Sequence, residues 1–115
     1  MNRIMLKSKL HRATVTDANL DYEGSCSISL AMCMAAGIIN YEQIQIYNVT
    51  NGERFTTYAI RDPETLDQVC MNGSAAHKAN IGDKVIICTY GHYNDQESRL
   101  HVPTEILLDD NNRMK

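Results

Sequence analysis

Tryptophan is absent from this chain of 115 residues, and phenylalanine occurs only once. The core must therefore be built from aliphatic side chains, supported by six methionines and six tyrosines. No apolar run is long enough to span a bilayer, and neither repeats nor low-complexity tracts occur. The length predicts one domain, residues 1–115, which can bury roughly two-thirds of the surface of its unfolded chain.

Positive charge is also scarce, because 11 basic residues face 14 acidic ones and the net charge is −3. This balance argues against nucleic-acid binding, which needs a basic surface. The first twelve residues are an exception, since they contain Arg3, Lys7, Lys9 and Arg12 and no acid. Such a basic edge suits a small anion, although lysines on an edge strand also serve simply to deter aggregation.

The sequence has no C-x-x-C motif. Its four cysteines, Cys26, Cys33, Cys70 and Cys88, are scattered, so zinc and redox motifs find no support. We read no signal peptide and expect reduced thiols in a cytoplasmic protein. The histidines are equally dispersed, and we expect no metal site.

Local patterns predict a chain of short strands. Residues 3–15 alternate as a half-buried strand with His11, Ala13 and Val15 on one face, and residues 16–21 are expected to turn. A strand is expected to begin at residues 27–28. Ser29 then fits the N-cap of a short helix that ends at Gly37.

The strongest local signal is Asn51-Gly52 between two alternating segments, residues 41–49 and 54–60, which predicts a β-hairpin. The remaining expectations are a turn at 62–64, strands at 67–72, 85–90 and 102–108, a helical turn at 73–77, a loop at 91–101 and a frayed end at 109–115. Short strands with one or two short helices favour a small closed β-barrel. A β-sandwich is the alternative.

The segment Tyr22 to Ser27, YEGSCS, contains the residues with the clearest potential for chemistry. Gly24 has no Cβ, so it can take backbone angles that other residues avoid, and it leaves its carbonyl open to close approach. Ser25 follows directly, so its hydroxyl can swing back onto that carbonyl. By itself the hexapeptide is also typical of an ordinary turn.

The pattern gains meaning beside four other segments in the same chain, which together resemble the pyruvoyl-dependent L-aspartate 1-decarboxylases. The matching segments are MLKSKLHRA at 5–13, DANLDYEGSC at 17–26, NVTNGERFTTY at 48–58, NGSAAH at 72–77 and IGDKVII at 81–87. They cover most of residues 1–90, and the resemblance weakens from Gly91 onward. A second departure is Ser74, where the family usually has alanine.

The resemblance implies a six-stranded double-psi β-barrel and a homotetramer with active sites at subunit interfaces. It also implies decarboxylation of L-aspartate to β-alanine and CO2 for pantothenate biosynthesis. The cofactor would be a pyruvoyl group made from Ser25 by self-cleavage after Gly24, giving chains 1–24 and 25–115. Substrate would bind it as a Schiff base, without pyridoxal phosphate or metal, and a maturation factor is a further expected partner.

The same resemblance assigns roles to particular residues. Tyr58 would donate the proton after CO2 leaves, and Thr57 would assist cleavage and contact substrate. The cations Lys9 and Arg54 would hold the carboxylates of aspartate, and an arginine suits this task because its guanidinium forms bidentate pairs. Further contacts would come from Asn72, Gly73, Ser74 and Ala75, with His11 and Tyr22 in support.

Strand geometry sets one condition on this site. Residues 54, 56 and 58 share one face of a regular strand, whereas Thr57 points to the other. We therefore predict a bulge, a twist or a strand end near these residues, and a regular strand through 54–58 counts against a shared site.

Two other functions stay open at this point. The first is a cysteine hydrolase that uses Cys26 and His77. The second is a non-catalytic barrel that binds a small anion or a partner protein through its basic edge. Both predict an intact chain.

Overall fold

Eight strands and three short helical segments make up the computed structural model, which describes all residues 1–115. In chain order they are β1 (Asn2–Thr14), β2 (Asp17–Asn19), β3 (Ser25–Ser29), α1 (Leu30–Ala36), β4 (Gln43–Asn48), β5 (Arg54–Asp62), β6 (Val69–Asn72), the 3-10 helix η1 (Gly73–His77), β7 (Lys84–Asn94), α2 (Asp95–Leu100) and β8 (Thr104–Leu107). The predicted mainly β class with short helices is confirmed. None of the helices is long or apolar enough to cross a membrane.

The strands pair in the order β2-β6-β3-β5-β4-β7-β1-β8. Pairing is antiparallel except for β3 with β5, β2 with β6 and β1 with β8. Only Val15 and Thr16 separate β1 from β2, and the Thr16 N–H donates to the Val69 carbonyl of β6 at 2.9 Å. Because β2 continues β1, the order forms a ring of six strands, with β8 outside it beside β1. The ring agrees with the barrel expected from the sequence.

The barrel is filled with aliphatic side chains, as the lack of tryptophan predicts. Its core includes Leu10, Ile28, Ile44, Ile46 and Ile87, each fully buried. The one phenylalanine, Phe55, packs against this core without being fully enclosed.

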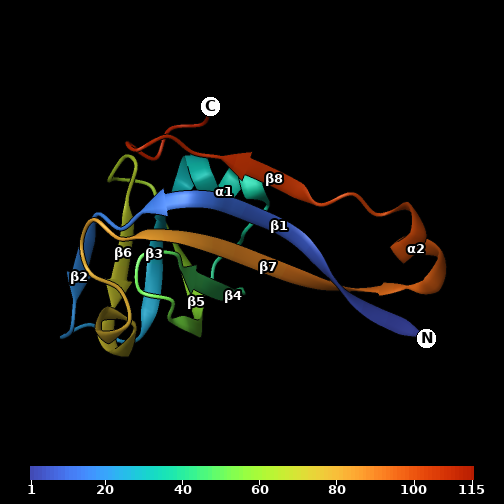
Figure 1. The fold of residues 1–115 in the computed structure, drawn as a ribbon, viewed down its shortest axis with the longest axis horizontal. Helices are drawn as coiled ribbons and strands as arrows, with labels where there is room; N and C mark the ends of the chain where they lie inside the picture. Colours follow the sequence, from blue (N-terminus) through green and yellow to red (C-terminus); the bar gives the residue numbers. More distant parts are fainter.

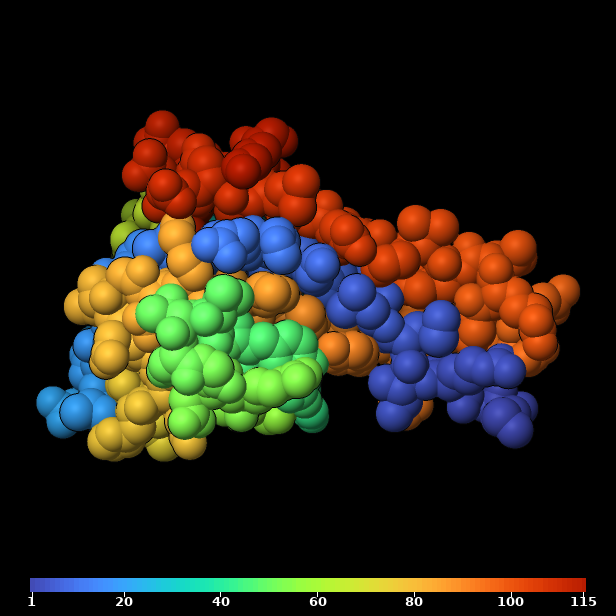
Figure 2. Space-filling model, in the orientation of Figure 1, coloured from blue at the N-terminus to red at the C-terminus, as the bar shows by residue number.

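One long arm projects from the barrel. Figure 1 shows the N-terminal half of β1 and the C-terminal half of β7 running side by side away from the body, with α2 at the far end. The ladder there joins Asn2 to Asn94 and Leu6 to Tyr90. The space-filling view shows the arm standing clear of the rounded body (Figure 2). It accounts for the elongated dimensions of 43 × 28 × 26 Å.

Several local predictions are confirmed. The hairpin of β4 and β5 pairs Tyr47 with Arg54 across the Asn51-Gly52 turn. Helix α1 follows the N-cap position Ser29 and ends at Gly37, whose φ of 69° is left-handed. The small residues 73–77 form the 3-10 helix η1.

The predicted inward face of the first strand is confirmed at Ala13 and Val15 and wrong at His11. Arg12 has a positive φ of 64°, and the β1–β7 register shifts between Leu10 and Ala13. This bulge inserts a residue, so Leu10, Ala13 and Val15 are buried while His11 is only half-buried.

Boundaries also differ in the segment that leads to the proposed cleavage point. The expected turn at 16–21 contains the short strand β2, and β3 begins at Ser25 rather than at residue 27. Ser25 therefore belongs to the sheet itself, which fixes its backbone through pairing with Asn72.

The C-terminal quarter is more ordered than expected. Instead of a loop at 91–101, β7 continues to Asn94 and α2 follows, with a capping box between Asn94 and Glu97. The end at 109–115 is not frayed, because Asn112 is buried and its Nδ2 donates to the carbonyls of Thr14 and Asp67 at 2.9 and 2.8 Å.

Candidate active site

Ser25 lies at the start of β3, 6% exposed, on the face of the strand opposite the core. The neighbouring Cys26 and Ile28 point into the core and are fully buried. Strand alternation therefore places Ser25 and Ser27 together on the other face. Pairing with β6 brings Asn72 opposite Ser25 and Cys70 opposite Ser27.

These four side chains form one hydrogen-bonded group. The Asn72 Nδ2 donates to Ser25 Oγ at 3.1 Å and to Ser27 Oγ at 3.0 Å. The Cys70 Sγ donates to Asn72 Oδ1 at 3.2 Å. Burial raises the pKa of the Cys70 thiol, with a contribution from the nearby Asp17 and Asp62. The thiol is therefore protonated at neutral pH and serves as a donor.

Gly73 packs closely against the backbone of residues 22–24, the segment that precedes Ser25. Its φ of 61° is left-handed, and a Cβ there would lie 2.6 Å from the Tyr22 carbonyl oxygen and 2.7 Å from the Gly24 nitrogen. Only glycine fits this contact. Ser74 continues the contact, since a Cβ on Gly24 would meet its Oγ at 3.6 Å. We call Gly24, Ser25, Ser27, Cys70, Asn72, Gly73 and Ser74 the Ser25 cluster.

Tyr58 lies beside this cluster. The parallel β3–β5 register pairs Cys26 with Ala59, so the next step back along both strands sets Ser25 opposite Tyr58 on the same face. A hollow of about 540 Å³ adjoins it, lined by Tyr41, Gln43, Thr56, Thr57 and Tyr58. Space for a small substrate therefore exists next to residue 25.

No bulge interrupts β5, although the strand begins at Arg54, so of the predicted alternatives the strand end is present and the bulge is not. The β4–β5 ladder runs without a register shift from Tyr58 to Arg54, so Thr57 lies opposite the buried Ile44, on the other face from Tyr58. By the condition set above, this regular strand counts against one chain alone gathering Arg54, Thr57 and Tyr58 in one site.

The two cations expected to bind substrate lie elsewhere on the barrel. Arg54 is four residues from Tyr58 along β5, roughly 13 Å at the usual rise of a strand. Its guanidinium lies 4.2 Å from the centre of the Tyr47 ring, a cation–π contact that draws it further from Ser25. Lys9 is aligned with Cys88, Gln45 and Thr56 across three successive strand pairs.

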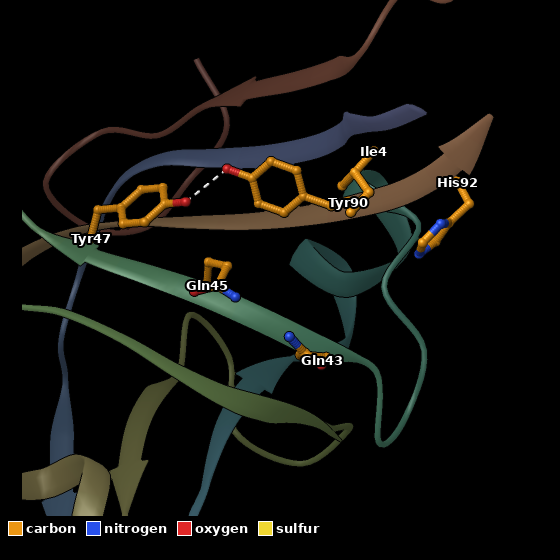
Figure 3. A pocket seen from close by; sticks show the side chains of 6 residues that line it. All are labelled: Ile4, Gln43, Gln45, Tyr47, Tyr90 and His92. Atoms are coloured by element: carbon orange, nitrogen blue, oxygen red, sulfur yellow. Dashed lines mark hydrogen bonds between the residues drawn. The ribbon is translucent and has the colours of Figure 1, made fainter. Parts of the chain in front are cut away.

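Figure 3 shows the pocket next to these cations, of about 440 Å³, between the arm and β4. In it the hydroxyls of Tyr47 and Tyr90 meet at 2.7 Å. Burial, and then the bond to Tyr47, raise the pKa of Tyr90, so it stays neutral. Lys9, Tyr47, Arg54 and Tyr90 form what we call the cation cluster. No residue of the Ser25 cluster lines either pocket, but Tyr58, which the β3–β5 register sets opposite Ser25, lines the hollow of about 540 Å³ and not this pocket.

The supporting residues are also divided. The Tyr22 backbone touches Gly73 in the Ser25 cluster, whereas its side chain is 63% exposed. His11 lies opposite Leu107 of β8 on the other side of the molecule. Its buried Nδ1 has no hydrogen-bond partner. Desolvation lowers the pKa of His11, and the charges of Lys9 and Arg12 lower it further.

Ala75 is buried in η1, and His77, at the end of the same helix, is exposed. Cys26 faces the core with 0% exposure, and burial raises the pKa of its thiol far above the ordinary value, with Cys70 and Cys33 adding to the shift. A nucleophilic thiolate is therefore excluded at this position, which argues against the hydrolase.

Comparison with known proteins now decides the family. A family described as aspartate decarboxylase matches residues 1–115. The chain belongs to the aspartate decarboxylase family. This match includes residues 91–115, so the weaker resemblance noted there does not mark a boundary.

Individual relatives agree along the whole chain. Aspartate 1-decarboxylase of Bordetella avium (strain 197N) is 52% identical over 115 residues, covering 100% of this chain and 94% of that protein. That of Pseudomonas aeruginosa (strain LESB58) is 55% identical over 114 residues, covering 99% and 90%. That of Azotobacter vinelandii is 57% identical over 108 residues, covering 94% and 86%.

Sequence reasoning missed Ser27 and Cys70 as neighbours of Asn72, and Tyr47 and Tyr90 as neighbours of Arg54. A signal for the first pair was available. Ser25 and Ser27 are two residues apart on one strand, as are Cys70 and Asn72 on another, so each pair shares a face.

Proposed function

We propose that this enzyme decarboxylates L-aspartate to β-alanine and CO2 by means of a pyruvoyl group that it makes from its own Ser25. The observation that carries the proposal is the Ser25 cluster. It holds the Gly24–Ser25 bond between the Asn72 amide on Ser25 Oγ and the close-packed backbone of Gly73. Neither contact is required to form an ordinary turn.

Self-cleavage begins with attack by Ser25 Oγ on the Gly24 carbonyl carbon. The new O–C bond forms, the C–N bond between Gly24 and Ser25 breaks, and the hydroxyl proton moves to the Ser25 nitrogen. Since both atoms belong to adjacent residues, the reaction is intramolecular. Oriented reactions of this kind gain roughly 7–11 kcal/mol over their bimolecular counterparts.

The ester then undergoes β-elimination. The Ser25 Cα loses a proton, the Cβ–Oγ bond breaks, and Gly24 departs as a carboxylate that keeps the oxygen. Water hydrolyses the remaining dehydroalanine, releasing ammonia and leaving the pyruvoyl group. The products are chains 1–24 and 25–115.

Negative charge grows on Oγ during elimination and on the Gly24 carbonyl oxygen during attack. The Asn72 N–H already points at Oγ and stabilises the first of these charges. Thr57 is the proposed helper for the second, by donating its hydroxyl to the carbonyl oxygen. It lies on β5, the strand that pairs with β3.

The pyruvoyl group at position 25 would supply the electron sink that loss of CO2 requires. The residues around it do the rest. Tyr58, which the register sets opposite position 25, is the proposed donor of a proton to the substrate carbon. Asn72, Gly73, Ser74 and Ala75 are the proposed further contacts to substrate, and Gly73 to Ala75 have small side chains that would let backbone donors come close.

Aspartate carries two carboxylates, and Arg54 and Lys9 are the proposed cations for them. Their distance from Ser25 within one chain is the reason to propose a site shared between copies, in which the cation cluster of one subunit faces the Ser25 cluster of another. The arrangement suits the homotetramer proposed for this enzyme. His11 and Tyr22 support the site in the same assembly.

Pantothenate biosynthesis, which uses β-alanine, is the proposed pathway. We place the enzyme in the cytoplasm, where its four unpaired cysteines suit a reducing compartment. A maturation factor that accelerates self-cleavage is a further proposed partner.

Incubation with L-aspartate tests the proposed activity, with β-alanine and CO2 measured as products. Ser25→Ala is the inactive control, and Ser98→Ala, a buried serine in α2 outside the site, should retain activity. Equal activity of the Ser25→Ala chain would disprove the pyruvoyl route. A fully cleaved chain that carries the pyruvoyl group and yet forms no β-alanine from aspartate would refute the proposed activity.

A further inference from the structure

Asn72 can present either of two chemically opposite groups to Ser25, its amide nitrogen or its carbonyl oxygen. Only the nitrogen stabilises negative charge on Ser25 Oγ, because it donates hydrogen bonds whereas the oxygen accepts them. Something in the structure must therefore hold the carboxamide in one of its two orientations.

The contacts around Asn72 supply that control. Cys70 Sγ donates to Oδ1 at 3.2 Å, on the far side of the carboxamide from Ser25. Ser27 Oγ accepts from Nδ2 at 3.0 Å, alongside the bond to Ser25 Oγ at 3.1 Å. A 180° turn of the carboxamide would leave the Cys70 thiol facing an N–H group, and a thiol sulfur is a weak acceptor.

We infer that Cys70 and Ser27 are positioning residues for self-cleavage, which fix the Asn72 carboxamide so that its N–H points at Ser25 Oγ. The inference rests on the self-cleavage proposed above and adds two residues to it. Neither touches the scissile bond, and both act through Asn72. Asn72 is only 4% exposed and Cys70 only 5%, so water does not compete for these bonds.

Burial supports the role of Cys70 in a second way. The raised pKa keeps the thiol protonated. A thiolate there would accept from the N–H of Asn72 and favour the opposite orientation. Ser27 Oγ accepts from the same Asn72 nitrogen as Ser25 Oγ, so it adds a second contact that holds this nitrogen beside the two serines.

The test follows cleavage of freshly purified intact chain by mass spectrometry over time. Cys70→Ala removes the donor, and we expect cleavage to slow by roughly three- to tenfold, the usual effect of one lost hydrogen bond. Cys70→Ser restores an O–H donor and should recover most of the rate. Cys33→Ala is the matched control, because Cys33 is also a buried thiol, and its one hydrogen bond goes to the carbonyl of Ile28, away from Asn72.

A purely structural role for Cys70 predicts a different pattern, in which Cys70→Ser fails to recover the rate and the loss of rate follows the loss of melting temperature. Ser27→Ala gives an independent reading, with a smaller slowing expected because Cys70 remains. Cys70→Ala cleaving at the wild-type rate would overturn the inference, as would Asn72→Ala cleaving at that rate. Failure of the wild-type chain to cleave, even with heating or a maturation partner, would instead overturn the proposed function itself.

Discussion

The Ser25 cluster and the cation cluster differ in how much one chain supplies. The Ser25 cluster is buried and cross-linked, with Ser25 6% and Asn72 4% exposed and each hydrogen-bonded to the other. The cation cluster lies on the outer face, where Arg54 is exposed and packs on Tyr47, and Tyr90 is 40% exposed. One chain supplies the contacts proposed for self-cleavage, whereas the proposed substrate site takes its cations from another copy of the chain.

Ser25→Ala should have the largest effect of all, because it removes the central residue of the Ser25 cluster. Without Oγ there is no nucleophile, so we expect no cleavage and no decarboxylation, while the fold is kept because the methyl group fits the same space. Intact mass and the aspartate assay measure both. Cleavage in this variant would place the nucleophile elsewhere.

Tyr58→Phe separates the two reactions. We expect cleavage at the normal rate and a fall in kcat of roughly 10²- to 10⁴-fold, the range for a lost general acid. Gel analysis of the two fragments and steady-state kinetics measure these effects. A kcat close to wild type would remove Tyr58 from the proton transfer.

Gly73→Ala tests the close contact inside the Ser25 cluster. A Cβ at 2.6 Å from the Tyr22 carbonyl must displace the cleavage segment. Because a misplacement of about 1 Å can cost 10²-fold in rate, we expect cleavage to slow by about that factor.

Gly52→Ala is the matched control for this variant. Gly52 also has a positive φ, of 80°, but a Cβ there meets nothing within 4 Å. It carries the same backbone strain without the overlap, so cleavage should be unaffected. Similar slowing in both variants would assign the effect to backbone strain alone.

Arg54→Gln tests the cation cluster. We expect normal cleavage and an increase in KM of roughly ten- to a hundredfold, because a charged hydrogen bond contributes about 1.5–3 kcal/mol. Co-expression of this variant with Ser25→Ala sharpens the result. Each chain alone is inactive or weak, and mixed assemblies should recover activity if the site is shared. No recovery would place both clusters of each site in one chain.

Alkylation of Cys26 has the smallest expected effect. Its pKa is raised above the ordinary thiol value by burial, so at pH 8 the thiolate is scarcer than in an unfolded chain. We expect iodoacetamide to leave Cys26 unmodified and decarboxylation intact in the folded protein, with modification only in denaturant. Loss of activity together with labelling of Cys26 would support the alternative hypothesis of a cysteine hydrolase.

The sequence predicted the elements whose signals are local. The Asn51-Gly52 hairpin and the helix ending at Gly37 depend on neighbouring residues alone. Helix α2 also had a local signal, because Asn94 and Glu97 have the spacing of a capping box, and we overlooked it. The ordered C-terminus had none, since Asn112 is held by backbone groups of Thr14 and Asp67 far away in the chain.

The candidate site also has a part that the sequence predicted and a part that it did not. Resemblance supplied its residues, and the structure placed Ser25, Asn72 and Gly73 together through pairing of β3 with β6. The regular ladder of β5 was not predicted, because the expected bulge, twist or strand end followed from placing Arg54, Thr57 and Tyr58 in one chain, although the resemblance already implied active sites between subunits. A site divided between chains gives no reason for a bulge.

Denaturing mass spectrometry of the purified protein tests the central claim most directly. The account predicts two fragments, residues 1–24 and 25–115, with the larger one lighter by one ammonia than a chain that begins with free serine. Two fragments with an N-terminal serine would mean hydrolysis without a pyruvoyl group. A single full-length mass that persists on heating and on incubation with a maturation partner would contradict the account.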